Sequence, residues 1–466
     1  MTELRKSVAP QEMVERALAI SRADGCIAIA DEITTANLRW ANNTLTTNGT
    51  THGRRLTVIA TVGGAQGTAA GVVSREGVTT ASVEDLVRAA EDAARAGTPA
   101  DDAAPLVTGT SASPNWGDPP ARTSMAAFAD FAPALGDAFA RARHEDRVLY
   151  GYAEHNVVST YLASSTGLRR RHDQPTGHVE INAKSSSYPA SVWAAAAGSD
   201  FSEIDLNALE ADVTQRLSWS QRRLDLPAGR YETLLPPSAV ADFMLYMSWV
   251  ASARDAQEGR TVFSKPGGGT RVGERLSDRP MTLRSDPSAP GLAVTPFVIA
   301  RSSGPATSVF DNGLPLEPTA WIENGTLRSL VQTRRSAEMT GLDVTPRINN
   351  LILEGQGSLP SLPEMVGTTG RGLLLTSLFY IRQVDPQTLL LTGLTRDGVF
   401  LIDGGEVAGA VNNFRFNESP VSLLGRVSEI GATQHTLGRD FGPIARTAMP
   451  PLRIPDFNMS TVSQAS

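Results

Sequence analysis

Histidine and cysteine, the residue types that most often hold zinc, are scarce in this chain and widely spaced. The only cysteine is Cys26, and the six histidines are His52, His144, His155, His172, His178 and His435. A helical His-Glu-x-x-His sequence binds zinc because both imidazoles face one metal while the glutamate takes a proton from the bound water. Neither this sequence nor His-Glu-x-x-x-His occurs, and residues 179–434 contain no histidine. The sequence therefore predicts that this chain holds no metal and no other cofactor.

Other patterns of catalytic residues are equally weak. Lys265 precedes Gly267–Gly269, whereas the lysine of a phosphate-binding P-loop follows its glycines, so we interpret this segment as a mobile loop. No Gly-x-Ser-x-Gly sequence occurs, and no Gly-x-Gly-x-x-Gly sequence follows a predicted strand. A serine nucleophile on a tight turn and a bound dinucleotide therefore have no support.

Hydrophobic spacing predicts an α+β arrangement for the first half of the chain. Helical spacing of apolar residues predicts helices at 10–23, 82–96, 124–143 and 206–222. Between them we expect short strands at 26–30, 38–41, 56–62, 69–73, 148–153, 157–163 and 177–183. We expect Phe128, Phe131 and Phe139 to lie in the core, because they recur at helical spacing.

A boundary at Leu226–Arg230 predicts two domains, 1–225 and 226–466. The stretch 238–253 is the last long helical pattern. After it we expect short strands at 292–300, 321–332, 373–384, 389–394, 399–403 and 406–411. Many short, closely spaced strands favour a barrel-like or sandwich-like domain. We therefore predict an α+β fold, in which an N-terminal α+β domain of helices and antiparallel strands precedes a mainly β C-terminal domain.

Composition excludes several classes of protein. The chain has 466 residues, 41% of them hydrophobic and 20% charged, which is typical of a globular protein. A net charge of -7 disfavours a nucleic-acid partner. Residues Met1–Lys6 lead into an amphipathic segment rather than an apolar signal sequence, and no apolar run reaches the roughly 20 residues of a membrane span. We expect a soluble, cytoplasmic protein with no membrane partner.

Short patches of sequence lie along the chain in a characteristic order. They are Arg39–Asn43, Phe310–Gly313, Trp321–Gly325, Gly372–Thr376, Gln383–Pro386, Asp397–Gly405 and Asn413–Pro420. Each patch alone is a weak signal. Their order over nearly the whole chain resembles the TldD/TldE family of metallopeptidases, also called PmbA or modulator of DNA gyrase.

The resemblance implies which kind of subunit this chain is. TldD-type subunits carry a His-Glu-x-x-x-His helix and a C-terminal cysteine that bind zinc, whereas TldE/PmbA-type subunits lack these ligands. The matching helix lies between 234–237 and 257–260 and contains only Asp242 and Asp255 as carboxylates, while the matching tail 430–438 has no thiol. The chain is thus similar to the TldE/PmbA type. This similarity implies a subunit that is inactive alone and that pairs with a TldD-like zinc subunit to degrade or process unfolded peptides.

Four residues are candidates for contacting such a peptide. His435 falls near the missing ligand and is expected either to touch metal or substrate across an interface or to be a hydrogen-bonded loop residue. Glu258 is expected either on a peptide-binding surface or in a solvated turn, since Gly259 is suited to end a helix. Gly372 and Thr376 bound a strand that either accepts a peptide as an added strand or lies inside a sheet.

Two other functions stay open at this point. The chain could be a divergent peptidase or amidase that acts alone, or a regulatory protein of the gyrase-modulator kind. Self-association is the alternative to a heteromeric partner. Peptide turnover by the purified chain alone would favour the stand-alone peptidase or amidase, and capture of a non-protease partner would favour the regulatory protein.

Overall fold

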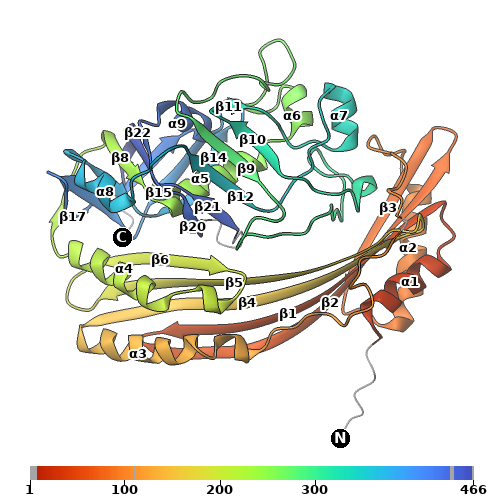
Figure 1. Cartoon of the computed structure of the whole chain (residues 1–466), viewed down its shortest axis with the longest axis horizontal. Helices are drawn as coiled ribbons and strands as arrows, with labels where there is room; N and C mark the ends of the chain where they lie inside the picture. The colour runs from red at the N-terminus through yellow and green to blue at the C-terminus, as the bar shows by residue number, and fades with distance from the viewer. Residues whose placement is uncertain (1–7, 110, 441–445, 464–466) are drawn as a thin grey trace, which may run out of the picture.

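The computed structural model describes residues 8–109, 111–440 and 446–463. One long sheet lies beneath two later sheets, as Figure 1 shows. Residues Met1–Lys6, on which the expectation about export rests, lie outside the described ranges. No helix in the described ranges is long and apolar enough to cross a membrane.

The first sheet is antiparallel, in the order β3-β2-β1-β4-β5-β6. Its strands are β1 (Gly25–Ala41), β2 (Thr44–Gly64), β3 (Gly67–Glu76), β4 (Arg147–Ser164), β5 (Arg169–Ser185) and β6 (Ser191–Gly198). The four central strands have 17 to 21 residues each, so the sheet spans the length of the molecule (Figure 1).

The continuity of these strands corrects the expected pattern. We expected separate strands at 26–30 and 38–41, but β1 runs through the polar residues between them without a turn. Residues 31–37 pair with β2 on one side and with β4 on the other, so both backbone edges are hydrogen-bonded. The strands expected at 148–153 and 157–163 are likewise one strand, β4. Pairing between distant segments therefore overrides the local turn preference of Asn and Thr.

Two pairs of helices pack near opposite ends of this sheet (Figure 1). They are α1 (Pro10–Ile20), α2 (Val83–Ala96), α3 (Phe131–His144) and α4 (Leu206–Trp219). The helix expected at 124–143 is split into a short 3-10 turn, η2 (Met125–Phe128), and α3. Proline has no backbone N–H to donate to the helical hydrogen bonds of later turns, so it is best accommodated in the first turn. Pro133 lies in the first turn of α3.

The three phenylalanines of this region lie in the core as predicted. Phe128, Phe131 and Phe139 are at most 6% exposed. Phe131 and Phe139 pack within 6.5 Å of Trp40 on β1, measured between ring centroids. The same core includes Phe400 of a later sheet, so the α3–α4 end of the first sheet is joined to the later part of the chain.

The single thiol yields a prediction about chemical reactivity. Cys26 is 1% exposed, and burial raises its pKa from 9.0 to about 11 because the thiolate is poorly solvated. We expect no reaction with an aromatic disulfide reagent near pH 8 in the folded chain and full reaction after unfolding in urea. Because the folded pKa is the higher one, the neutral thiol stabilises the fold below about pH 9, and this contribution is lost as the pH rises toward 11. Rapid labelling of the folded chain near pH 8 would contradict the buried environment.

The later part of the chain forms two sheets around a shared core. One has the order β14-β15-β18-β22-β8-β13-β16-β17-β7, with β19 paired to β22, and the other has the order β11-β10-β9-β12-β21-β20. The strands of the larger sheet are β7 (Arg223–Leu224), β8 (Gly229–Leu235), β13 (Arg371–Leu375), β14 (Leu378–Asp385), β15 (Leu390–Thr395), β16 (Val399–Asp403), β17 (Glu406–Val411), β18 (Phe414–Glu418), β19 (Glu429–Ile430) and β22 (Leu452–Val462). Those of the smaller sheet are β9 (Met281–Ser285), β10 (Thr319–Glu323), β11 (Thr326–Leu327), β12 (Leu351–Gly355), β20 (Gln434–Thr436) and β21 (Thr447–Met449).

Helices in this part are short except for the first. They are α5 (Pro237–Trp249), α6 (Ala253–Gln257), α7 (Arg334–Thr340), α8 (Leu362–Gly367) and α9 (Pro420–Arg426). Helix α5 contributes to the same core as strands of both later sheets. The predicted α+β fold, an antiparallel sheet with helices followed by β-rich sheets, is confirmed. The division into two domains at residue 226 stays a prediction.

The prediction of a strand at 292–300 is wrong. This segment contains only an isolated bridge between Phe297 and Pro315. The backbone pairs briefly with residues 313–316, since Val298 N donates to Leu314 O and Leu316 N donates to Pro296 O, both at 2.9 Å. Beyond this point the side-chain amide of Asn312 accepts a hydrogen bond from Ala300 N at 2.7 Å and donates one to Ala300 O at 2.8 Å, so the ladder does not continue.

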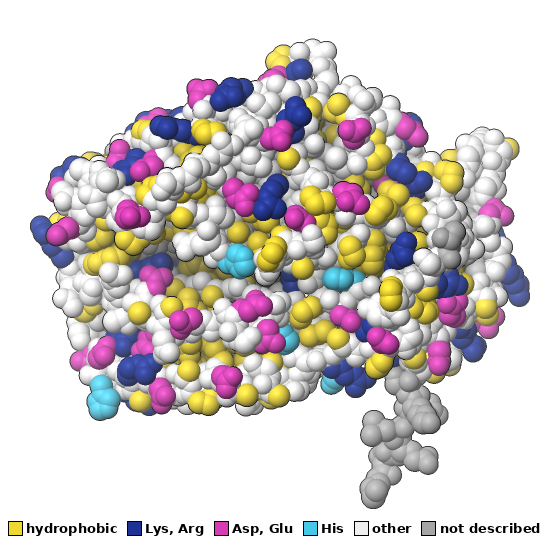
Figure 2. All heavy atoms as spheres, viewed as in Figure 1, with side chains coloured by type: hydrophobic (Ala, Val, Ile, Leu, Met, Phe, Trp, Pro, Cys, Tyr) yellow, Lys and Arg dark blue, Asp and Glu magenta, His cyan; other side chains and the backbone are white. Residues whose placement is uncertain are grey.

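An ion pair joins the first sheet to this loop region. Asp31, on β1, is 1% exposed, and both its carboxylate oxygens lie 2.7 Å from Nη2 of Arg301. The hydroxyl of Thr160, on β4, also donates to Asp31 at 2.7 Å. Figure 2 shows the molecule hollowed between the long sheet and the later sheets, with hydrophobic side chains along the hollow. The Asp31–Arg301 pair is thus one of the polar links between the two layers.

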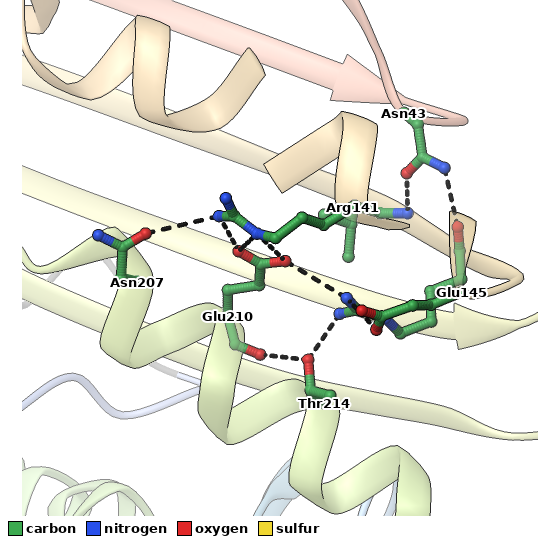
Figure 3. Close-up of polar contacts among 8 residues, drawn as sticks. Asn43, Arg141, Glu145, Asn207, Glu210 and Thr214 are labelled. Atoms are coloured by element: carbon green, nitrogen blue, oxygen red, sulfur yellow. Dashed lines mark hydrogen bonds and ion pairs between the residues drawn. The ribbon is translucent and has the colours of Figure 1, made fainter. Parts of the chain in front are cut away.

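A second polar network, centred on the buried Glu210, ties α3 to α4, as Figure 3 shows. The carboxylate of Glu210 accepts hydrogen bonds from Nε of Arg141 at 3.1 and 3.2 Å and from Nη2 of Arg147 at 3.3 Å. Nη1 of Arg147 also donates to the hydroxyl of Thr214 at 2.6 Å. The side-chain amide of Asn43 donates to the Arg147 carbonyl oxygen at 2.8 Å, which attaches the β1–β2 turn to the same network.

Candidate functional site

Helix α5 is the element in which a zinc motif of the resembling family would fall. It begins at Pro237, whose missing N–H and fixed backbone suit the first turn of a helix. Apolar residues occupy nearly its whole circumference, so the helix is buried between the later sheets. The one carboxylate on it, Asp242, is 0% exposed.

The carboxylate of Asp242 holds the segment that follows β20. Its two oxygens accept hydrogen bonds from the backbone N–H groups of Arg439 at 3.2 Å and Asp440 at 3.1 Å. The chain can approach the Asp242 carboxylate this closely only because residue 438 is glycine, since a Cβ atom at Gly438 would lie 2.5 Å from Oδ1 of Asp242. Residues almost 200 positions apart in sequence are therefore fixed together at this point.

Arg439 lies at the centre of the resulting cluster. Its Nη1 donates to the hydroxyl of Ser377 at 2.6 Å and to the carbonyl oxygen of Arg396 at 3.2 Å, and its Nη2 forms an ion pair with Asp397. The guanidinium carbon also lies 5.6 Å from the ring centroid of Trp193 on β6, within the range of cation–π attraction. The arginine thus links the first sheet to the turn after β13 and to the segment beside α5.

The third carboxylate of the cluster, Asp440, binds backbone. It accepts the N–H groups of Tyr380 and Ile381, both at 2.9 Å. Tyr380 has a φ of 58°, a left-handed conformation that is uncommon for a residue with a side chain, and these hydrogen bonds help to hold it. Asp242, Asp397 and Asp440 are all engaged by N–H donors, so this cluster orders the backbone and offers a metal no vacant carboxylate.

No group of three or more His, Cys, Asp or Glu side chains within the described ranges is arranged to hold a metal ion. Arg254 and Asp255 do not combine as metal ligands, because Arg254 pairs with Glu258 at 3.1 Å and with Asp101. The residues present at α5 therefore do not fit a zinc ion.

The four predicted peptide-contacting residues lie at three separate elements, α6, β20 and β13. Glu258 follows α6, where it forms ion pairs with Arg254 and Arg260, and Gly259, with a φ of 77°, ends the helix. His435 lies on β20 with an exposed side chain that packs against Gly291. Substrate contact by either residue stays a prediction.

Gly372 is the second residue of β13 and Thr376 directly follows its last, and both are buried. This strand pairs with β8 on one side and with β16 on the other, so it presents no free edge to which a peptide strand could add. The backbone N–H and the hydroxyl of Thr376 both donate to Gly398 O, at 2.9 and 3.0 Å. Their position is therefore that of an internal strand. Of the four candidates, Thr376 lies beside the Arg439 cluster, next to Ser377.

The residues that make this cluster were not predicted from the sequence. Arg439 and Asp440 are ordinary surface residue types, and although Asp397 opens the patch Asp397–Gly405, no local pattern marks the meeting of these residues with Asp242. The single usable signal was Asp242 itself, a lone carboxylate in an otherwise apolar helix, because a buried charge requires partners.

Comparison with known proteins places this fold and site in a class. Residues 228–461 match the model of the PmbA/TldA metallopeptidase C-terminal domain. This match covers about half of the 466 residues, and the chain belongs to the PmbA/TldD metallopeptidase family. No curated protein matches the chain at a significant level.

Solved structures share the fold over nearly the whole chain. TldE from Thermococcus kodakarensis is 16% identical, with a TM-score of 0.77 over 97% of this chain and 99% of that one. A candidate modulator of DNA gyrase from Bacteroides thetaiotaomicron is 12% identical, with a TM-score of 0.75 over 97% and 98%. A second candidate modulator, from Thermotoga maritima, is 16% identical, with a TM-score of 0.75 over 96% and 99%.

The chemistry of α5 predicts the metal content of the purified chain. We expect far less than one zinc per chain after mild dialysis, because carboxylates held by N–H donors and an arginine cannot supply a tetrahedral ligand set. Elemental analysis by mass spectrometry measures this. The control is the His435→Ala variant: zinc near one equivalent in the parent that is lost in this variant would contradict the expectation.

Proposed function

We propose that this chain is a TldE/PmbA-type subunit, without catalytic residues of its own, of a TldD/TldE-type zinc metallopeptidase complex that degrades or processes unfolded peptides. The observation that carries the proposal is that the one carboxylate on α5 is already bound by groups of this chain. Asp242 binds two backbone N–H groups, and the guanidinium of Arg439 lies in the adjoining cluster. The likeness to TldE supports the same assignment at the level of the fold.

In this proposal the partner supplies the metal and the general base, and this chain shapes the site in which the peptide lies. Zinc lowers the pKa of a bound water to near neutrality, and a carboxylate base then takes the proton during attack on the peptide carbonyl. The contribution of this chain is positional, because correct placement of a reacting group lowers the barrier without adding a chemical group.

Exposed apolar side chains support an interface in the later part of the chain. Trp249 is 40% exposed, Tyr380 57% and Val384 58%. Aromatic residues at such positions are common at the centres of protein interfaces. A partner subunit or a second copy would remove these side chains from water.

Co-expression with a TldD-like chain bearing a His-Glu-x-x-x-His helix tests the proposal. We expect the two chains to co-purify and to elute together at a mass above that of either chain, as measured by light scattering and native mass spectrometry. The Val384→Asp variant is expected to weaken the complex, and Leu45→Asp, at a similarly exposed site of the β1–β2 hairpin, serves as its control. Two chains that stay separate at micromolar concentration, with each folded, would argue against the proposed role.

A further inference from the structure

A cavity of about 380 Å³ lies beside the C-terminal end of α5, where strands β9, β10 and β11 approach it. Its volume is within the range of small-molecule pockets, roughly 300–1,000 Å³. Most of its wall is apolar and includes Leu245, Trp249, Phe263, Trp321 and Leu330. An apolar group of moderate size can therefore be buried there.

Two arginines also line this cavity. They are Arg347 and Arg446, and the described lining contains no aspartate or glutamate. Nη1 of Arg347 donates to the backbone oxygen of Ser248 at 3.2 Å. Nε of Arg446 donates to the backbone oxygen of Ala293 at 3.1 Å, and its Nη2 donates to the hydroxyl of Thr176 at 2.6 Å and to the backbone oxygen of Pro175. Neither guanidinium forms an ion pair with any residue that the structure describes.

Partial burial without an anion is unfavourable for both cations, which are of intermediate exposure. Desolvation lowers the pKa of Arg347, and it lowers the pKa of Arg446 to about 10. Both side chains therefore stay charged at neutral pH. A buried charge with no counter-charge costs free energy that a bound anion would offset. Charged groups in a cavity with such shifted pKa values are common at binding sites.

A second cavity lies beside the first. It has a volume of about 330 Å³ and shares Arg347 and Asn349 with the first. Its lining also includes Thr160 on β4, Gln174 on β5, Arg301 and Asp311, so it carries more polar and charged groups. Arg347 thus lines both the more apolar cavity and the more polar one. A ligand with an apolar side chain, a carboxylate and a polar backbone would match these two cavities and the arginine that lines both.

We propose that this cavity binds a carboxylate attached to a large apolar group, with Arg347 and Arg446 as its counter-charges. Planar guanidinium groups hold carboxylates through paired hydrogen bonds. Two sources share this chemistry: the C-terminal residue of an unfolded peptide that ends in leucine or phenylalanine, and a free apolar carboxylic acid. The inference deepens the proposed function, because it names the part of the peptide that this chain would hold.

Titration calorimetry on the isolated full chain tests the inference without any partner. The probes are acetyl-Gly-Gly-Ala-Leu with a free carboxylate, its C-terminal amide, and N-acetyl-leucine. We expect the free acid to bind roughly tenfold or more tightly than the amide, since the charged hydrogen bonds are lost in the amide. Tighter binding of the tetrapeptide than of N-acetyl-leucine indicates a peptide terminus, and equal binding indicates a free acid.

Variants localise the binding. Arg347→Gln and Arg446→Gln are each expected to weaken acid binding roughly tenfold, and Ser329→Trp, which fills the cavity without removing charge, is expected to block it. Arg328→Gln is the matched control, because Arg328 is 59% exposed and pairs with Glu323 outside the cavity. Equal binding of acid and amide, or parent-like binding by both cavity arginine variants, would overturn the inference. Because the partner is absent, failure here is separable from failure to form a complex.

Discussion

The isolated chain is expected to hydrolyse unfolded peptides no faster than buffer, whereas its complex with a TldD-like subunit is expected to hydrolyse them readily. Activation of water at neutral pH requires a metal or a tuned acid–base pair, and general acid–base catalysis alone contributes roughly 10²- to 10⁴-fold. In this chain the carboxylate on α5 binds backbone N–H groups instead. Liquid chromatography of a casein-derived peptide mixture, with the chain shown free of partner by mass spectrometry, measures the difference.

Three variants of the complex separate catalysis from assembly. Replacing the partner's motif glutamate by glutamine is expected to abolish hydrolysis while the two chains still co-elute. Glu258→Ala and His435→Ala in this chain are expected to lower the rate modestly, through substrate placement, with the chemistry intact. The proposed division of roles fails if the isolated chain hydrolyses peptides at a rate that disappears with a single substitution in its own sequence.

Loss of Arg301 is expected to destabilise the junction between the first sheet and the later part by about 2 kcal/mol, between the values for exposed and for buried ion pairs, because the Arg301 side chain is 33% exposed. The reason is that Asp31 is 1% exposed and would retain only the Thr160 hydroxyl as its described side-chain donor. Urea titration of Arg301→Ala, followed by circular dichroism, measures the shift of the unfolding midpoint. A chain of this size can unfold in more than one step, so the earliest transition is the one to compare.

A matched pair of controls makes this prediction specific. Arg371→Ala removes a surface partner of Asp403, with both side chains more than half exposed, and is expected to cost about 0–1 kcal/mol. Asp31→Asn combined with Arg301→Ala is expected to recover part of the loss, because no charge then remains buried. An Arg301→Ala midpoint equal to that of Arg371→Ala would show that the pair contributes little.

The sequence by itself determined which side chains were available for chemistry. No fold of this chain can place an imidazole from residues 179–434 at a metal site, since this range contains no histidine. It also determined the helices with strong local signals: α2 begins directly after Ser82, within one residue of the predicted start, although the Ser82 side chain makes no capping hydrogen bond to it. Such signals act over a few residues, so they can be recognised without knowledge of the rest of the chain.

Tertiary structure decided what those local signals could not. Residues 31–37 form strand only because β2 and β4 flank them, and the strand 372–376 is internal because β8 and β16 pair with it. The meeting of Asp242 with Arg439 depends on packing between segments 197 positions apart. Hydrogen bonds and ion pairs of this kind form between groups that are distant in sequence, and no periodicity or spacing along the chain encodes which pairs will meet.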